Sequence, residues 1–464
     1  MTNNAKHQVH HLSTAFIFIF GALGGLLFGF DTGIISGASP LIESTFHLSI
    51  AQTSFVTSSV LIGSSIGALS IGTLSDKYGR RKMLLISALL FIAGSLLSAF
   101  ATGFVSMAIA RIILGLAVGG ASGLTPSYLA ELATTEHRGS ISGMFQLMTT
   151  AGILLAYVSN IGFLHHNLLG WADWRWMLGS ALIPAILLLF GSLLLPESPR
   201  YLVQNGNITE ARAVLHVLRA KTNVDPDQEL TNIEKIAAQD KNQGGIRELF
   251  KVAKPSVFVA VGIMLLQQLV GINSVIYYLP QVFIKGFNFP DNKAIWISVG
   301  IGVVNFLTTI LATIIMDKFN RKTFLLFGSV VMALSLIIIS IMSFTMSIKD
   351  AAVPTMLFIA LYIFGFAISW GPIAWILIGE IFPLNVRGIG NSIGSAANWI
   401  GNFLVTQFFL SLLNLCHDKI GGPFLVFAAF AILSIFFVIF CVPETRGKSL
   451  EQIELELRKK TKVK

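Results

Sequence analysis

Twelve apolar segments, each long enough to cross a lipid bilayer as a helix, follow one another along the 464-residue chain. Such a crossing needs about 20 apolar residues. A transmembrane barrel would need short strands in which polar and apolar residues alternate, and these long apolar segments do not have that pattern. The chain is therefore predicted to be an all-α membrane protein of twelve transmembrane helices. The segments centre near Leu26, Ile62, Phe91, Ala117, Gly152, Leu187, Gly271, Val304, Met332, Gly365, Gly401 and Ile435.

The low charge content agrees with burial in lipid and excludes a soluble enzyme of this length. Only 12% of the residues are charged and 54% are apolar, whereas soluble domains carry roughly 25% charged residues. The net charge of +9 sits in short loops between apolar segments, so it reports topology and does not indicate a nucleic-acid partner. The two cysteines, Cys416 and Cys441, provide no disulfide framework.

Lysine and arginine gather in alternate loops. If the N-terminus, the loops after even-numbered segments and the C-terminus face the cytoplasm, 26 of the 32 Lys and Arg residues lie on that side. The positive-inside rule favours this orientation. We therefore expect a multi-pass protein of the plasma membrane with both termini in the cytoplasm.

Four regions are expected along the chain. Residues 1–195 and 255–443 each hold six segments, residues 196–254 form a cytoplasmic linker, and residues 444–464 form a cytoplasmic tail. Apolar residues at helical spacing predict short amphipathic helices over 208–220 and 229–238, and a similar helix over 449–460.

Three charged motifs of the first half recur in the second half. Glu131 and Arg138-Gly139 return as Glu380 and Arg387-Gly388. The three repeats are offset by 241, 249 and 247 residues. Duplicated six-helix halves are typical of carriers that rock around a central site. The other two motifs are Gly72-Thr-Leu-Ser-Asp76-Lys-Tyr-Gly-Arg80-Arg81, returning as Thr313-Ile-Ile-Met-Asp317-Lys-Phe-Asn-Arg321-Lys322, and Pro196-Glu197-Ser-Pro-Arg200, returning as Pro443-Glu444-Thr-Arg446.

On these motifs the chain resembles the major facilitator superfamily and, within it, the sugar porter family, nearly end to end. Further residues typical of sugar porters are Gln267-Gln-Leu-Val-Gly-Ile-Asn273 and Gly371-Pro-Ile-Ala-Trp375. The resemblance is greatest to bacterial proton-coupled symporters of the glucose, galactose, arabinose and xylose type. It implies import of a monosaccharide, a hexose such as glucose, by alternating access driven by the proton gradient.

Several other functions compete with this interpretation. A pentose or inositol symporter is the first alternative within the class. An uncoupled facilitative carrier is the second, and a membrane sugar sensor is the third, although sensors of the family carry longer cytoplasmic tails than this one. A membrane enzyme is the last, because the apolar segments hold no nucleophile–base pair, metal motif or phosphate loop.

Asp31 and Arg111 are the candidates for proton coupling. Both lie in apolar segments, where a charged side chain costs about 2.5–3.5 kcal/mol on insertion scales. Desolvation favours the neutral acid, whereas a neighbouring arginine favours the carboxylate. The resemblance implies that Asp31 accepts the proton and Arg111 tunes it, and facilitative animal carriers have Asn at this position. The alternative is a static ion pair.

Neutral polar residues within the apolar segments are the candidates for sugar binding. Amides both donate and accept hydrogen bonds, as sugar hydroxyls do, whereas glue between helices is the competing role for each of them. Ile153 follows Gln146 by seven residues on the same helix face. Gly271 is expected to break its helix near the site. The predicted site consists of Gln146, Ile153, Gln267, Gln268, Asn273, Asn305, Trp375, Asn398 and Trp399.

Charged residues of both signs recur where the two halves would meet in the cytoplasm. The resemblance implies that they form a gate that holds the outward-open state, and solvated loop charge is the alternative. No metal site or cofactor is expected, and His165 and His166 lack further ligands. The expected partners are a monosaccharide, a proton and the bilayer, with no nucleic acid, and the protein is expected to be monomeric. The gate residues are Asp76, Arg80, Glu131, Arg138, Glu197, Arg200, Asp317, Arg321, Glu380, Arg387 and Glu444.

Overall fold

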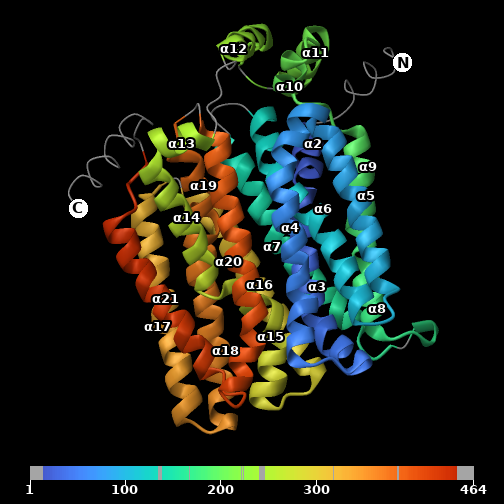
Figure 1. The fold of residues 1–464 in the computed structure, drawn as a ribbon, viewed down its shortest axis with the longest axis vertical. Helices are drawn as coiled ribbons and strands as arrows, with labels where there is room; N and C mark the ends of the chain where they lie inside the picture. The colour runs from blue at the N-terminus through green and yellow to red at the C-terminus, as the bar shows by residue number, and fades with distance from the viewer. Residues whose placement is uncertain are drawn as a thin grey trace.

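The computed structural model describes residues 14–133, 138–166, 168–220, 222, 224–239, 246–316, 318–383 and 386–446. These residues form helices and no strand. Twelve helical segments among them are long and apolar enough to cross a membrane, and they stand side by side as one bundle (Figure 1). The predicted all-α architecture is confirmed. The expected helix over 449–460 lies outside the described residues.

Six spans come from the first half of the chain. The first span, Leu23–Phe46, lies further along than the expected centre near Leu26, because a break at Ala22 ends the short first helix. The sixth span is assembled from α8 and α9. The helices are α2 (Thr14–Gly21), α3 (Leu23–Phe46), α4 (Ile50–Tyr78), α5 (Arg80–Ala99), α6 (Phe104–Leu132), α7 (Arg138–Phe163), α8 (Asp173–Ser180) and α9 (Leu182–Leu194).

The other six spans come from the second half, and two of them are interrupted. The seventh span consists of α14 and α15, and the tenth consists of α18, the π-helical turn η3 and α19. The helices are α14 (Lys254–Leu269), α15 (Ile272–Phe287), α16 (Asp291–Ile315), α17 (Arg321–Thr345), α18 (Ile348–Gly365), η3 (Phe366–Trp370), α19 (Gly371–Glu380), α20 (Arg387–Leu415) and α21 (Gly421–Phe440).

The break in the seventh span lies at Gly271, as the sequence predicts. Its φ of 93° is in the left-handed region, which a residue with a Cβ rarely adopts. A Cβ at this position would also lie 2.2 Å from the Phe427 ring. Backbone conformation and packing therefore both require glycine here.

Glycines on α4 and α6 allow these two spans to pack backbone against backbone. A Cβ on Gly63 would lie 2.1 Å from the Ile112 carbonyl oxygen, and one on Gly115 would lie 2.0 Å from that of Val60. Small residues at such crossings let membrane helices approach closely. Outside the bundle, large apolar side chains face outward, as lipid contact requires, including Ile183, Phe190, Phe258, Leu307, Leu357 and Phe440.

Four short helices lie at one end of the bundle (Figure 1). They are α10 (Pro199–Gln204), α11 (Ile208–Arg219), α12 (Pro226–Gln239) and α13 (Ile246–Val252). The sequence predicts α11 and α12 but neither α10 nor α13. We call this end the α10–α12 face and the other end the opposite face. An apolar cluster packs α10 to α12 against the ends of α5 and α6 and includes Met83, Leu84, Tyr128, Leu202, Leu215 and Leu230.

Arg219 joins α11 and α12 to α6. Its buried guanidinium donates to the carbonyl oxygens of Leu132 and Ala133, at 2.9 and 3.3 Å, where α6 ends. It also forms two bonds of 2.6 and 2.7 Å to the Glu229 carboxylate of α12. One side chain thus joins three helices and satisfies carbonyls that the end of a helix leaves without donors.

Arg219→Leu is expected to destabilise the protein by about 2–3 kcal/mol, because charge-assisted bonds are lost and two carbonyls lose their donor. Thermal unfolding in detergent measures the change. Arg212→Leu is the matched control: Arg212 also joins α11 to α12, through Asp227 at 2.9 Å, but both side chains are more than half exposed. Such a pair contributes little. Equal losses in the two variants would contradict the role of Arg219.

Candidate functional site

A pocket lies between the two halves of the bundle. Helices α3, α6 and α7 supply one wall, and α14, α15, α16, η3, α19 and α20 supply the other. Its empty volume is about 710 Å³, counting the part open to solvent. None of the described residues that line it carries a charge. All nine residues predicted for sugar binding line it: Gln146, Ile153, Gln267, Gln268, Asn273, Asn305, Trp375, Asn398 and Trp399.

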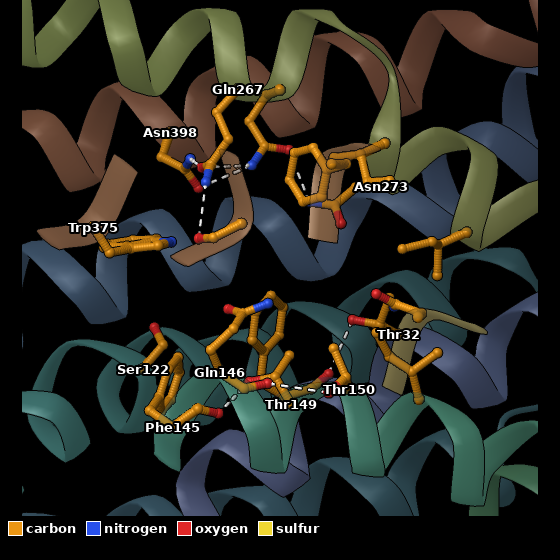
Figure 2. Close-up of a pocket in the computed structure, with 18 of the residues that line it drawn as sticks. Thr32, Ser122, Phe145, Gln146, Thr149, Thr150, Gln267, Asn273, Trp375 and Asn398 are labelled. Carbon is orange, nitrogen blue, oxygen red and sulfur yellow. Dashed lines mark hydrogen bonds between the residues drawn. The ribbon is translucent and has the colours of Figure 1, made fainter. Parts of the chain in front are cut away.

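Four amides of the second half form one hydrogen-bonded group. Asn398 donates to the Gln267 side-chain oxygen at 2.6 Å and accepts from Gln268 at 3.2 Å. Asn273 donates to Gln268 at 2.7 Å across the break at Gly271. Figure 2 shows this group on one side of the pocket. A polyol that enters can exchange bonds with amides that both donate and accept.

The interruption of the tenth span helps to place Gln267. Within the π-helical turn η3, the carbonyl oxygen of Trp370 accepts from the Gln267 amide at 2.8 Å. Turns of this kind leave carbonyls outside the regular helical ladder and occur at functional sites. Trp370 itself donates to the Ser329 hydroxyl at 2.9 Å and is fully buried. The Trp370 side chain therefore anchors the backbone carbonyl that accepts from Gln267.

The facing wall comes from α7 and carries Gln146, Thr149 and Thr150 (Figure 2). The two threonines follow Gln146 by three and four residues, so they share its helix face. This spacing is visible in the sequence, but the predicted site does not include the two threonines. Aromatic rings add apolar surface, and Phe28 meets Trp399 edge to face at 5.4 Å. Other pocket residues that were missed are Thr32, Ser122, Phe145, Ile272, Ile276, Phe366 and Gly371.

Asp31 and Arg111 form an ion pair outside the pocket lining. Both guanidinium Nη atoms face the two carboxylate oxygens of Asp31, and the side chains are 4% and 0% exposed. The Nε of Arg111 has no hydrogen-bond partner. Thr32, the next residue after Asp31, does line the pocket. The ion pair therefore joins α3 to α6 next to one wall of the pocket.

Four predicted gate residues of the first half, Asp76, Arg80, Glu131 and Glu197, lie together where α4 and α6 end and α5 begins, at the α10–α12 face. Arg80 pairs with Asp76 at 2.9 Å and with Glu131 at 3.1 Å. The Glu197 carboxylate accepts from the backbone amides of Arg80 and Ser198 at 2.8 and 2.9 Å. Burial raises the pKa of Glu197 above its ordinary value, although these backbone donors and Arg80 act in the other direction.

The second half repeats this arrangement. The Glu444 carboxylate accepts from the backbone amides of Arg321 and Lys322 at 3.0 and 3.1 Å, at the start of α17. Glu380 accepts from the Thr445 hydroxyl at 2.6 Å and lies 4.0 Å from the Arg321 guanidinium. Each ion pair and carboxylate hydrogen bond named above for the described gate residues joins two residues of the same half. A gate that joins the halves stays a prediction.

Four other residues belong to the predicted gate. Arg200 belongs to α10, and Arg387 begins α20 and donates to the Phe382 carbonyl at 3.4 Å. Arg138 begins α7, but its side chain lies outside the described part of the chain. Asp317 lies outside it altogether.

Three polar side-chain contacts between the halves lie on the other side of the pocket, toward the opposite face. Gln281 of α15 donates to the Ser39 hydroxyl of α3 at 3.3 Å. Lys285 of α15 pairs with Glu43 of α3 at 3.2 Å, and Ser58 of α4 donates to Gln407 of α20 at 2.6 Å. No sequence pattern indicates these partners, because they are more than 200 residues apart.

Comparison with known proteins agrees with this architecture. The family model of the sugar (and other) transporters matches residues 17–457. A D-xylose transporter of Levilactobacillus brevis is 45% identical over 97% of both chains. The glucose transporter GlcP of Staphylococcus epidermidis is 40% identical over 96% of this chain and 97% of its own. The solved structure of the proton:xylose symporter XylE bound to 6-bromo-6-deoxy-D-glucose has a TM-score of 0.82 and is 32% identical, covering 96% of this chain and 99% of its own. The chain therefore belongs to the sugar porter family of the major facilitator superfamily, and it is a multi-pass membrane transporter rather than an enzyme.

Proposed function

We propose that this protein imports a monosaccharide together with a proton by alternating access. The observation that carries the proposal is the pairing of two sites in one bundle. One is a pocket between the halves that is lined by neutral amides, and the other is the buried Asp31–Arg111 ion pair next to one of its walls.

The chemistry of the pocket favours a neutral polyol. Its described lining holds amides, hydroxyls and aromatic rings without a charged side chain. Charged substrates would leave their charge unpaired at mid-membrane, which is costly. A sugar ring presents hydroxyls to the amides around Asn398 and apolar C–H faces to Trp375 and Trp399, all of which line the pocket.

Asp31 favours proton coupling over facilitated diffusion. A carboxylate paired with arginine in a dry site changes its proton affinity when the arginine moves, because the ionic and neutral forms respond oppositely to burial. Arg111 lies on α6 and Asp31 on α3, so relative movement of these helices alters the pair. The neighbour XylE, described as a proton:xylose symporter, supports the same coupling.

We propose glucose, a hexose, as the sugar, with a pentose as the competing candidate. The relatives named above as transporters of xylose and of glucose are 45% and 40% identical, so they do not separate the two sugars. Ile153, an apolar pocket residue, favours the hexose, because the resemblance implies a second glutamine at this position in some pentose-binding relatives. The protein is proposed to act as a monomer in the plasma membrane, with the α10–α12 face and both termini in the cytoplasm.

Reconstituted vesicles test the proposal. Vesicles loaded with glucose or xylose are expected to take up the labelled sugar by counterflow, and sugar addition is expected to alkalinise a weakly buffered medium. Mannitol and an amino acid serve as controls that give neither signal. Counterflow without alkalinisation would favour a facilitative carrier, and preference for xylose over glucose would replace the hexose assignment by the pentose alternative.

A further inference from the structure

Helix α15 is attached to the first half at three points along its length. Nearest the pocket, the Tyr157 hydroxyl of α7 donates to the Ile276 carbonyl oxygen at 3.0 Å. Further along, Gln281 contacts Ser39 and Lys285 contacts Glu43. All three contacts join the two halves between the pocket and the opposite face. They therefore hold this side of the pocket closed in the structure.

The contact nearest the pocket has a specific chemical cause. In an α-helix the carbonyl of Ile276 accepts from the backbone N–H of the fourth residue on, which is Pro280. Proline has no N–H, so its presence removes this helical bond. Ile276 is 5% exposed, and a buried carbonyl without a donor costs free energy. The Tyr157 hydroxyl supplies the missing donor from the other half of the molecule.

The ring of Tyr157 is fitted between helices of the second half. A Cβ on Gly302 of α16 would lie 3.0 Å from the Tyr157 ring, so the glycine leaves the room that the ring occupies. Tyr157 is 1% exposed. It follows Ile153 by one helical turn, and both Ile153 and Ile276 line the pocket. The hydroxyl therefore sits just beyond the pocket, toward the opposite face.

We propose that Tyr157 is a positioning residue of the transport cycle, whose hydroxyl latches α15 against the first half through the carbonyl that Pro280 leaves unpaired. Opening of the pocket toward the opposite face breaks this bond. Water that enters the opened space then donates a hydrogen bond to the Ile276 carbonyl. The proposal rests on the proposed transport function, but its test requires no sugar.

The test measures closure directly with a buried thiol. Ser39 is 1% exposed and lies on the closed path, so Ser39→Cys is placed in a Cys416→Ser, Cys441→Ser background. Tyr157→Phe is expected to raise the rate of its modification by a polar methanethiosulfonate reagent about tenfold in purified protein, since one buried bond of the closed state is lost. An unchanged rate in folded protein would overturn the latch.

Tyr362→Phe is the matched control. The Tyr362 hydroxyl is also buried and donates to a backbone carbonyl, that of Val270, at 2.9 Å, but both residues belong to the second half. Its loss is expected to lower thermal stability without changing modification of the thiol. An equal rise in both variants would show general loosening and would contradict the latch.

Pro280→Ala supplies the decisive comparison, because alanine restores an N–H four residues after Ile276. In this background Tyr157→Phe is expected to change the modification rate by less than about twofold, since the carbonyl now has its helical donor. A tenfold effect in both backgrounds would contradict the pairing. If Tyr157→Phe alone gives no folded protein, recovery by Pro280→Ala supports the proposal and failure to recover contradicts it. Counterflow of the unmodified protein tests transport separately, so the two failures are distinguishable.

Discussion

Asp31→Asn is expected to abolish accumulation of sugar against a gradient while sugar-for-sugar exchange continues. Asparagine keeps the size and a hydrogen-bonding oxygen but carries no titrating proton. One charge moved with the sugar makes about 2.3 kcal/mol available per 100 mV, which corresponds to roughly fiftyfold accumulation. The variant loses this coupling at the residue paired with Arg111. The pocket amides remain in place, because Asp31 is not part of the lining.

Exchange and accumulation are measured in the same vesicles, with uptake normalised to the amount of folded protein. This correction matters because Arg111 loses its counter-ion and a buried charge without a partner is destabilising. Asp227→Asn makes the same chemical change on the exposed side of α12 and is expected to accumulate sugar normally. Accumulation by Asp31→Asn at the wild-type level would show that the ion pair is structural and that the proton is carried elsewhere.

Gln268→Ala is expected to weaken sugar binding by about ten- to a hundredfold, since each unpaired buried hydrogen-bonding group costs about 1–3 kcal/mol. Gln268 bridges Asn273 and Asn398. Its truncation removes one hydrogen-bonding partner of the sugar, and Asn273 and Asn398 also lose a contact that holds their side chains in place. Quenching of tryptophan fluorescence on sugar addition measures the affinity, because Trp375 and Trp399 line the pocket.

Asn402→Ala is the matched control for this experiment. Asn402 is a buried amide one turn beyond Asn398 on α20, and it does not line the pocket. Its truncation is expected to leave affinity within about twofold, because it contributes no group to the sugar. Similar losses in both variants would attribute the effect of Gln268 to disturbed packing, and wild-type affinity of Gln268→Ala would remove the seventh span from the proposed site.

Sequence patterns predict the spans well, and the residues predicted for sugar binding line one pocket. Both depend on local chemistry. Long apolar runs have one stable form in lipid, and Gln267, Gln268 and Asn273 stand out as amides within them. The break at Gly271 depends on this one residue, because glycine readily adopts the positive φ found there. These features need no knowledge of which helices become neighbours.

Contacts that depend on the neighbouring helix could not be predicted in the same way. Pro280 shows from sequence that the Ile276 carbonyl lacks a helical donor, but only the packing of α7 identifies Tyr157 as the replacement. Likewise, the motif around Glu197 predicts a carboxylate of the cytoplasmic gate. The structure places its carboxylate on the first backbone amides of α5, within the same half.

The repeated use of Glu197 and Glu444 bears on what the covalent chain contributes. Each carboxylate binds the start of a helix in its own half, α5 or α17. Each six-helix unit therefore supplies the acceptor for the first backbone amides of its own helix. The pocket, in contrast, takes side chains from both units. Covalent linkage of the two units raises the effective concentration of one unit at the other. Two polypeptides divided between α12 and α13 would lose that linkage and keep the determinants of their own folding.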